Sequence, residues 1–164
     1  MSEAAQPFYE RFDAKAGFLA AIERLLEQPG RELRVFDPDL SSLRLNDPER
    51  VARLERFLLA SRTHRLYFVV HETDHLTRLC PRMMALLARF THAIQVNRTQ
   101  DEIRELQDAF LVLDSMHYVR RPVARLFRGA IGLGDENEGL AMRARFMEIW
   151  AASFPAVSGT TAGL

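Results

Sequence analysis

The pentapeptide HETDH at positions 71–75 carries the residue types of a hydrolytic metal site. When such a string lies on one helix, its two histidines bind zinc on one face and the glutamate acts as general base. Here the string directly follows an apolar run, Leu66–Val70, that predicts a strand, and extended backbone would separate the imidazoles. The leading prediction therefore contains no metal and no cofactor. A metal-dependent hydrolase that uses His71, Glu72 and His75 remains the alternative.

A second group of candidates lies between Ser115 and Gly134, a segment rich in arginine and free of acidic residues. If this segment forms a hairpin, alternation along the strands places some guanidinium groups on a common face, which suits binding of an anion or a protein partner. Two structural explanations compete with this one: pairing with acidic residues of neighbouring helices, and protection of an edge strand by charge. The basic candidates are His117, Arg120, Arg121, Arg125 and Arg128.

Polar residues also follow the predicted strands. Ligands of open parallel sheets bind in the crevice outside the carboxyl ends of the strands. Loops are rich in polar residues for other reasons, which is the structural alternative. The crevice candidates are Asp37, Asp39, His71, Glu72, Asn97, Arg98 and Asp114.

The elements that position these residues fall into two halves. In the first half, helical patterns alternate with short apolar strands, which is typical of right-handed parallel crossovers. Asp47 and Pro48 indicate a helix start, and the spacing of Thr99 and Glu102 predicts a capping box that opens a brief helix. The predicted helices cover 14–28, a stretch from Pro48, a stretch from Pro81, and 100–106, and the predicted strands cover 33–36, 66–70 and 93–96.

After residue 107 the pattern changes to short apolar segments with small connections, at 110–113, 117–121 and 126–131, which predict hairpin strands. A final helix is predicted to begin near Asp135 and to bury Phe146 and Trp150. The expected fold class is α/β. It contains a mixed sheet with parallel βαβ crossovers in the first half, hairpin strands in the second, and helices on both faces.

The chain has 164 residues, of which 48% are apolar and 27% charged, and its formal net charge is zero. This composition predicts one soluble domain at 14–157, with a disordered or loosely packed N-terminus at 1–13 and a C-terminal tail at 158–164. The single cysteine, Cys80, predicts a reducing, cytoplasmic location. We expect no membrane insertion, because no apolar run approaches the roughly 20 residues that cross a bilayer. The zero charge argues against nucleic acid as a partner.

The C-terminal half resembles the second half of a phospholipase D-like domain. The features that carry this resemblance are the segments 110–114 and 117–121, the closing helix with Phe146 and Trp150, the helix that follows Cys80-Pro81-Arg82, and the strand 94–96. More narrowly, residues 30–164 resemble a bacterial domain of unknown function that occurs alone or joined to GNAT-type N-acetyltransferases.

Phospholipase D catalysis requires the motif H-x-K-x4-D, in which the histidine attacks phosphorus and the lysine holds the phosphate. Aligning Asp114 with the motif's aspartate puts Gln107 at the histidine and Ala109 at the lysine, and neither residue performs these roles. The resemblance therefore implies a non-catalytic domain that binds a protein partner or an anionic ligand. A phosphoryl-transfer enzyme with an unrecognised arrangement is a further alternative.

The resemblance also implies association. Phospholipase D-like units commonly work in pairs, as tandem halves or as homodimers, and this chain contains one such unit. We therefore expect a homodimer. The relatives joined to acetyltransferases imply an acetyltransferase as a protein partner.

Overall fold

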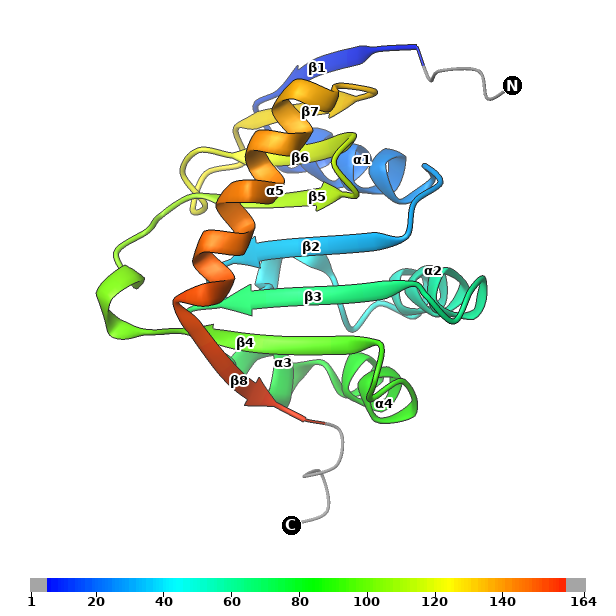
Figure 1. Ribbon diagram of the computed structural model, residues 1–164, viewed down its shortest axis with the longest axis vertical. Helices are drawn as coiled ribbons and strands as arrows, with labels where there is room; N and C mark the ends of the chain where they lie inside the picture. The colour runs from blue at the N-terminus through cyan, green and yellow to red at the C-terminus, as the bar shows by residue number, and fades with distance from the viewer. Residues whose placement is uncertain (1–5, 159–164) are drawn as a thin grey trace.

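The computed structural model describes residues 6–158, which form an eight-stranded mixed sheet flanked by helices (Figure 1). The strands are β1 (Phe8–Phe12), β2 (Glu32–Asp37), β3 (Arg65–Val70), β4 (Ile94–Thr99), β5 (Ala109–Leu113), β6 (His117–Arg121), β7 (Gly129–Leu133) and β8 (Ser153–Val157). The helices are α1 (Lys15–Leu26), α2 (Pro48–Leu59), α3 (Asp74–Leu79), α4 (Pro81–Arg89) and α5 (Glu136–Ala151), with 3-10 turns η1 (Ser41–Leu43) and η2 (Asp101–Ile103). The order of the strands in the sheet is β1-β7-β6-β5-β2-β3-β4-β8.

The first half of the chain forms the parallel crossovers that its pattern predicts. Strand β3 pairs in parallel with both β2 and β4, and α2 begins at Pro48 with the Asp47 carboxylate accepting a hydrogen bond from the Glu49 backbone N–H at 3.1 Å. Helices α1 to α4 cover one face of the sheet in Figure 1. The larger apolar core lies between these helices and the sheet, and it includes Phe18, Leu54 and Leu87.

The second half forms the predicted hairpins and closing helix. Strands β5, β6 and β7 are a consecutive antiparallel meander, and β5 also pairs antiparallel with β2. Helix α5 crosses the opposite face of the sheet diagonally (Figure 1) and buries Met142, Phe146 and Ile149 against it. Gly139 lets the start of α5 approach the β5–β6 turn, because a Cβ at this position would lie 2.2 Å from the carbonyl oxygen of Ser115.

The ends of the chain differ from expectation. The segment 1–13 was predicted to be disordered or loosely packed, but Phe8–Phe12 forms β1, an edge strand that pairs antiparallel with β7. The opposite edge is β8, which pairs with β4 and was not predicted. Its Pro155 obscures the strand in the sequence, although an edge strand tolerates proline because one side of its backbone needs no ladder hydrogen bond. Residues 1–5 and most of the predicted tail, 159–164, lie outside the described residues.

Two local predictions also need correction. Strand β7 covers Gly129–Leu133, so the strand predicted at 126–131 begins three residues too early. The capping box is wrong, because β4 continues through Thr99 and the Thr99 hydroxyl bonds the ring of His71 instead of a helix N-terminus. Only the single turn η2 forms where a helix over 100–106 was expected. No helix among residues 6–158 is both long and apolar enough to cross a membrane.

Candidate functional site

Five strands, β1, β2, β3, β4 and β6, end at the same edge of the sheet, which we call the carboxyl edge. Strands β2, β3 and β4 run in parallel, and β6 runs with them because two antiparallel pairings separate it from β2. The last residues of β2 and β6, Asp37 and Arg121, are 84 positions apart in the sequence, yet Arg121 Nη2 lies 2.7 Å from Asp37 Oδ1. Both side chains are buried. The centre of the carboxyl edge is therefore closed by an internal ion pair.

Arg121 is held through both terminal nitrogens and the face of its guanidinium group, although its buried Nε has no hydrogen-bond partner within residues 6–158. Its Nη1 donates to the Ala124 carbonyl at 2.5 Å, its Nη2 also donates to the Ser42 hydroxyl at 2.9 Å, and its guanidinium lies over the Phe18 ring at 4.3 Å from the centroid. Burial lowers the pKa of Arg121, and the Asp37 carboxylate opposes that shift. These contacts give Arg121 a structural role.

Asp37 is the acidic partner in this buried ion pair. Its Oδ2 accepts hydrogen bonds from the backbone N–H groups of Asp39 and Leu40 at 3.1 and 2.7 Å. Burial raises the pKa of this carboxyl group, while Arg121 and the two N–H donors oppose the rise. The neighbouring Asp39 accepts from the backbone and hydroxyl of Ser41 and so orders the same turn.

His71, the first residue after β3, uses both ring nitrogens. Nε2 lies 2.8 Å from the Leu106 carbonyl oxygen, which only accepts, so Nε2 carries a proton and donates. Nδ1 lies 2.6 Å from the Thr99 hydroxyl, and in the neutral ring it accepts from that group. A histidine engaged in this way joins the ends of β3 and β4 to the connection before β5.

A charged network reinforces that connection. Arg98 Nε and Arg104 Nη2 donate to the His71 carbonyl at 3.2 and 2.8 Å. Both arginines also pair with Glu72, Arg104 in close contact and Arg98 at 3.8 Å. The network ties the segment between β4 and β5 to the end of β3.

The pentapeptide 71–75 does not form the helical zinc motif. His71 precedes α3, which begins at Asp74, so the two histidines do not share one helix. Across residues 6–158, no group of three or more His, Cys, Asp or Glu side chains is placed to hold a metal ion. The geometry gives no support to the alternative that uses His71, Glu72 and His75.

The arginine-rich segment does not present one common basic face. Arg120 and Arg121 are adjacent in β6 and point to opposite faces: Arg120 Nη1 pairs with Glu138 of α5 at 3.1 Å, and Arg121 points toward Phe18. Arg125 and Arg128 are exposed in the β6–β7 connection. Arg120 thus follows one of the two structural explanations considered for this segment, pairing with an acidic residue of a neighbouring helix.

Three further candidates lie away from the centre of the carboxyl edge. Asp114 and His117 flank the β5–β6 turn at the opposite edge, where Asp114 accepts from the backbone N–H of Arg31 and Glu32, and His117 Nδ1 accepts from that of Gly134. Asn97 is internal to β4, which extends beyond its predicted end, and it donates to the Ser153 hydroxyl at 2.9 Å. All three stabilise neighbouring backbone or strands.

A hollow of about 380 Å³ opens between α5 and the carboxyl-edge ends of β5 and β6, and we call it the α5–β6 hollow. Two ion pairs flank it: Arg120 with Glu138, and Arg145, which binds both carboxylate oxygens of Asp108 at 3.1 and 2.8 Å. Both guanidinium side chains are less than half exposed, at 44% and 42%. The apolar part of the lining is Ala109, Phe110, Pro122, Ala141 and Met142. Sequence reasoning missed Asp108 and Arg145, because their pairing joins a loop to the middle of a distant helix.

A protein-family model described as a domain of unknown function, DUF7931, matches residues 14–158. The chain belongs to this family. No curated protein matches the DUF7931 chain.

Several solved structures share its fold. Nuc from Salmonella typhimurium, a phospholipase D family member, superposes with a TM-score of 0.61 at 11% identity, covering 93% of this chain and 100% of Nuc. NucT from Helicobacter pylori gives 0.62 at 11% identity, covering 92% and 100%. The archaeal chromatin protein TrmBL2 gives 0.62 at 13% identity, covering 91% of this chain but 55% of TrmBL2. The DUF7931 chain therefore has a phospholipase D-like fold, as its sequence resemblance predicts.

Proposed function

We propose that this DUF7931 chain is a non-catalytic phospholipase D-like domain that binds an anionic group, phosphate or carboxylate, in the α5–β6 hollow. The alignment through Asp114 supports the loss of catalysis. It puts Gln107 and Ala109 at the positions of the histidine nucleophile and the phosphate-binding lysine, and an amide and a methyl group supply neither function.

The observation that carries the proposal is the pair of arginines beside the vacated position. Ala109 lines the same hollow as Arg120 and Arg145. Each guanidinium already has a carboxylate partner, but the partly exposed, single-contact pair of Arg120 with Glu138 contributes only about 0–1 kcal/mol. An incoming anion can therefore replace Glu138 at little cost and add a charge-assisted contact to Arg120, while the apolar lining contacts the rest of the ligand.

The contacts of the other polar residues support the proposed absence of catalysis. His71 has both ring nitrogens in hydrogen bonds, and Asp114 serves the β5–β6 turn. A phosphoryl-transfer site built on Asp114 would also lie at the edge of the sheet opposite to the α5–β6 hollow. No nucleophile is therefore assigned.

Inorganic phosphate tests the binding site, with amide chemical shifts as the readout. We expect saturable shifts around Arg120 and Arg145 in the wild type, and their loss in the double variant Arg120→Glu/Arg145→Glu. Arg125→Glu is the matched control, because this exposed arginine lies outside the hollow. Equal binding by the double variant and the control contradicts the assignment.

Turnover tests the absence of catalysis. We expect no hydrolysis of bis(p-nitrophenyl) phosphate above the buffer rate. Hydrolysis that Asp114→Asn abolishes, in a variant that remains folded by circular dichroism, would establish the phosphoryl-transfer alternative instead.

We also propose that the domain forms a homodimer and that its protein partner is a GNAT-type N-acetyltransferase. The support for both is the resemblance of residues 30–164 to phospholipase D-like units and to a domain joined to such enzymes. Size-exclusion chromatography of the chain mixed with a purified GNAT-type N-acetyltransferase tests the partner. Co-elution is expected, and separate elution at tens of micromolar contradicts the partnership.

A further inference from the structure

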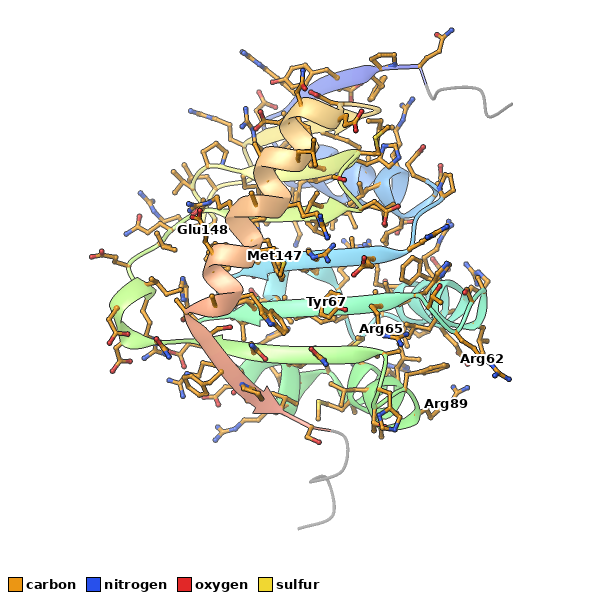
Figure 2. All side chains as sticks on the ribbon, viewed as in Figure 1. Arg62, Arg65, Tyr67, Arg89, Met147 and Glu148 are labelled. Atoms are coloured by element: carbon orange, nitrogen blue, oxygen red, sulfur yellow. The ribbon has the colours of Figure 1, made fainter. Side chains whose placement is uncertain are left out.

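A second hollow, of about 360 Å³, lies at the edge of the sheet opposite to the carboxyl edge, and we call it the basic hollow. Strands β3 and β4 begin there, and α2 and α4 end there, because each crossover helix runs antiparallel to the strands that it connects. Two short connections, 60–64 and 90–93, therefore meet. Figure 2 shows Arg62, Arg65 and Arg89 at this same end of the molecule.

The positive charge of the basic hollow is only partly neutralised. The side chains of Arg62 and His92 are exposed and have no ionic or hydrogen-bonding partner within residues 6–158. Arg65 has no carboxylate partner either, and its Nη1 donates to the carbonyls of Arg62 and His64 at 2.7 and 2.8 Å. Among the described residues, Glu55 is the one carboxylate that pairs with a lining residue, and it lies 2.7 Å from Arg89.

At the centre of the carboxyl edge, in contrast, the arginines have carboxylate partners. There, Arg98 and Arg104 share Glu72, and Arg121 pairs with Asp37. Lysines and arginines stabilise a helix C-terminus, which accounts for Arg89 in the last turn of α4. Arg62 and Arg65 come after the end of α2, in the turn and at the first residue of β3. Their excess charge at one place is not required by the fold.

The hollow also has an apolar wall and one fixed cation. Leu59 is 64% exposed, although it ends a helix whose Leu58 is buried, and Phe90 also lines the hollow. The two carbonyls that accept from Arg65 hold its guanidinium in place, which reduces the entropy lost when a ligand binds. Charge next to apolar surface selects an anion that carries an apolar body.

We propose that the basic hollow binds a small organic anion, with Arg62, Arg65 and His92 contacting a phosphate or carboxylate group and Leu59 and Phe90 contacting an attached apolar or aromatic body. This site is separate from the α5–β6 hollow and independent of the proposed function. A phosphate and a carboxylate share the recognition chemistry, and the probes below distinguish them.

Titrations followed by amide chemical shifts test the proposal with four probes: phenyl phosphate, benzoate, inorganic phosphate and phenol. We expect phenyl phosphate or benzoate to shift the amides of 58–65 and 89–93 in a saturable manner, and the stronger of the two identifies the anionic group. Inorganic phosphate carries only the anionic group and phenol only the aromatic ring. Judged by the shifts of the same amides, each is expected to bind the basic hollow at least about tenfold more weakly.

Variants at exposed positions keep the test independent of folding. Arg62→Glu is expected to weaken binding of the stronger probe about tenfold or more, because it replaces a positively charged donor by a carboxylate that repels the anionic probe. Leu59→Ser is expected to weaken the aromatic probes but not inorganic phosphate. Arg78→Glu on α3 is the matched control, because this arginine is exposed and lies outside the hollow. Equal affinity of Arg62→Glu and Arg78→Glu, or shifts confined to the α5–β6 hollow, overturns the proposal.

Discussion

At the scale of single residues, two adjacent arginines have different roles because strand side chains alternate between faces. Arg120 is partly exposed beside α5, whereas Arg121 is buried against Asp37. The sequence predicts a basic segment but does not separate these roles, because Asp37 lies 84 positions away. Charge reversal at Arg121 would therefore disturb folding. For this reason the test of the α5–β6 hollow combines Arg120 with Arg145 and leaves Arg121 unchanged.

The buried ion pair leads to a prediction for a double-mutant cycle. Arg121→Gln leaves the Asp37 carboxylate buried without a counterion, which we expect to lower the free energy of unfolding by about 3–5 kcal/mol. Combining it with Asp37→Asn removes that charge, so the loss in the double variant should be smaller than the sum of the two single losses. Urea denaturation measures all three variants. Additive losses would contradict the coupling, and Arg125→Gln, at an exposed position, should change stability by less than about 0.5 kcal/mol.

His117 leads to a prediction of pH dependence. Burial lowers the pKa of this imidazole, with Asp114 opposing the shift, and Nδ1 accepts a hydrogen bond from the Gly134 backbone N–H. As the pH falls below about 6.5, the unfolded chain binds a proton at this residue more readily than the folded chain does. The contribution to stability is therefore complete above that pH and is lost as the pH falls through the lower folded-state pKa.

The His117→Asn variant isolates this effect, since its side-chain oxygen can accept from Gly134 and does not titrate. Between pH 7.5 and pH 5 we expect the unfolding free energy of the wild type to fall relative to that of the variant by on the order of 1 kcal/mol. Urea denaturation at each pH measures the difference. A constant difference across this range contradicts the assignment.

At the scale of elements, the closing helix is positioned by a close backbone approach. Gly139 of α5 lies so near the β5–β6 turn that a Cβ would come within 2.2 Å of the Ser115 carbonyl oxygen, and backbone atoms there cannot move aside cheaply. Glycine inside a helix is ordinarily about 1 kcal/mol less favourable than alanine. The periodicity of α5 predicts which face of the helix is buried. It does not predict the contact between Gly139 and the β5–β6 turn, because the only trace of that contact in the sequence is a glycine inside a helix.

Gly139→Ala is therefore predicted to destabilise the protein by about 1–3 kcal/mol. Helix propensity alone predicts the opposite, a stabilisation, because alanine favours helices more than glycine does. Ala144→Gly is the control on the exposed face of the same helix, and it should follow helix propensity with a loss of about 1 kcal/mol. Thermal and urea denaturation measure both. Stabilisation by Gly139→Ala would mean that α5 does not pack closely on the turn.

At the scale of the whole molecule, one phospholipase D-like unit accounts for the described chain, and the proposed homodimer can be tested directly. This chain covers 100% of Nuc and of NucT, so its unit is the size of those chains. Light scattering should give a mass of about twice 18.8 kDa. A monomeric mass at tens of micromolar contradicts the dimer.

The amino-acid sequence by itself determined the main features of the architecture. Apolar periodicity, the Asp47-Pro48 helix start and short turns predicted the parallel crossovers, the hairpins and α5, because these patterns reflect which side chains face the core. The residue types Gln107 and Ala109 likewise need no structure to argue against phospholipase D catalysis.

Only the tertiary structure decided which charges are neutralised and which are not. The partners of Arg121 and Arg145 come from distant segments, and strands β1 and β8 are defined by the neighbours that they pair with rather than by strong local patterns. The basic hollow likewise joins the connections 60–64 and 90–93, which are separate in the sequence and meet only because two parallel strands begin at one edge. Local patterns encode burial, whereas ion pairing depends on distances between segments that packing alone brings together.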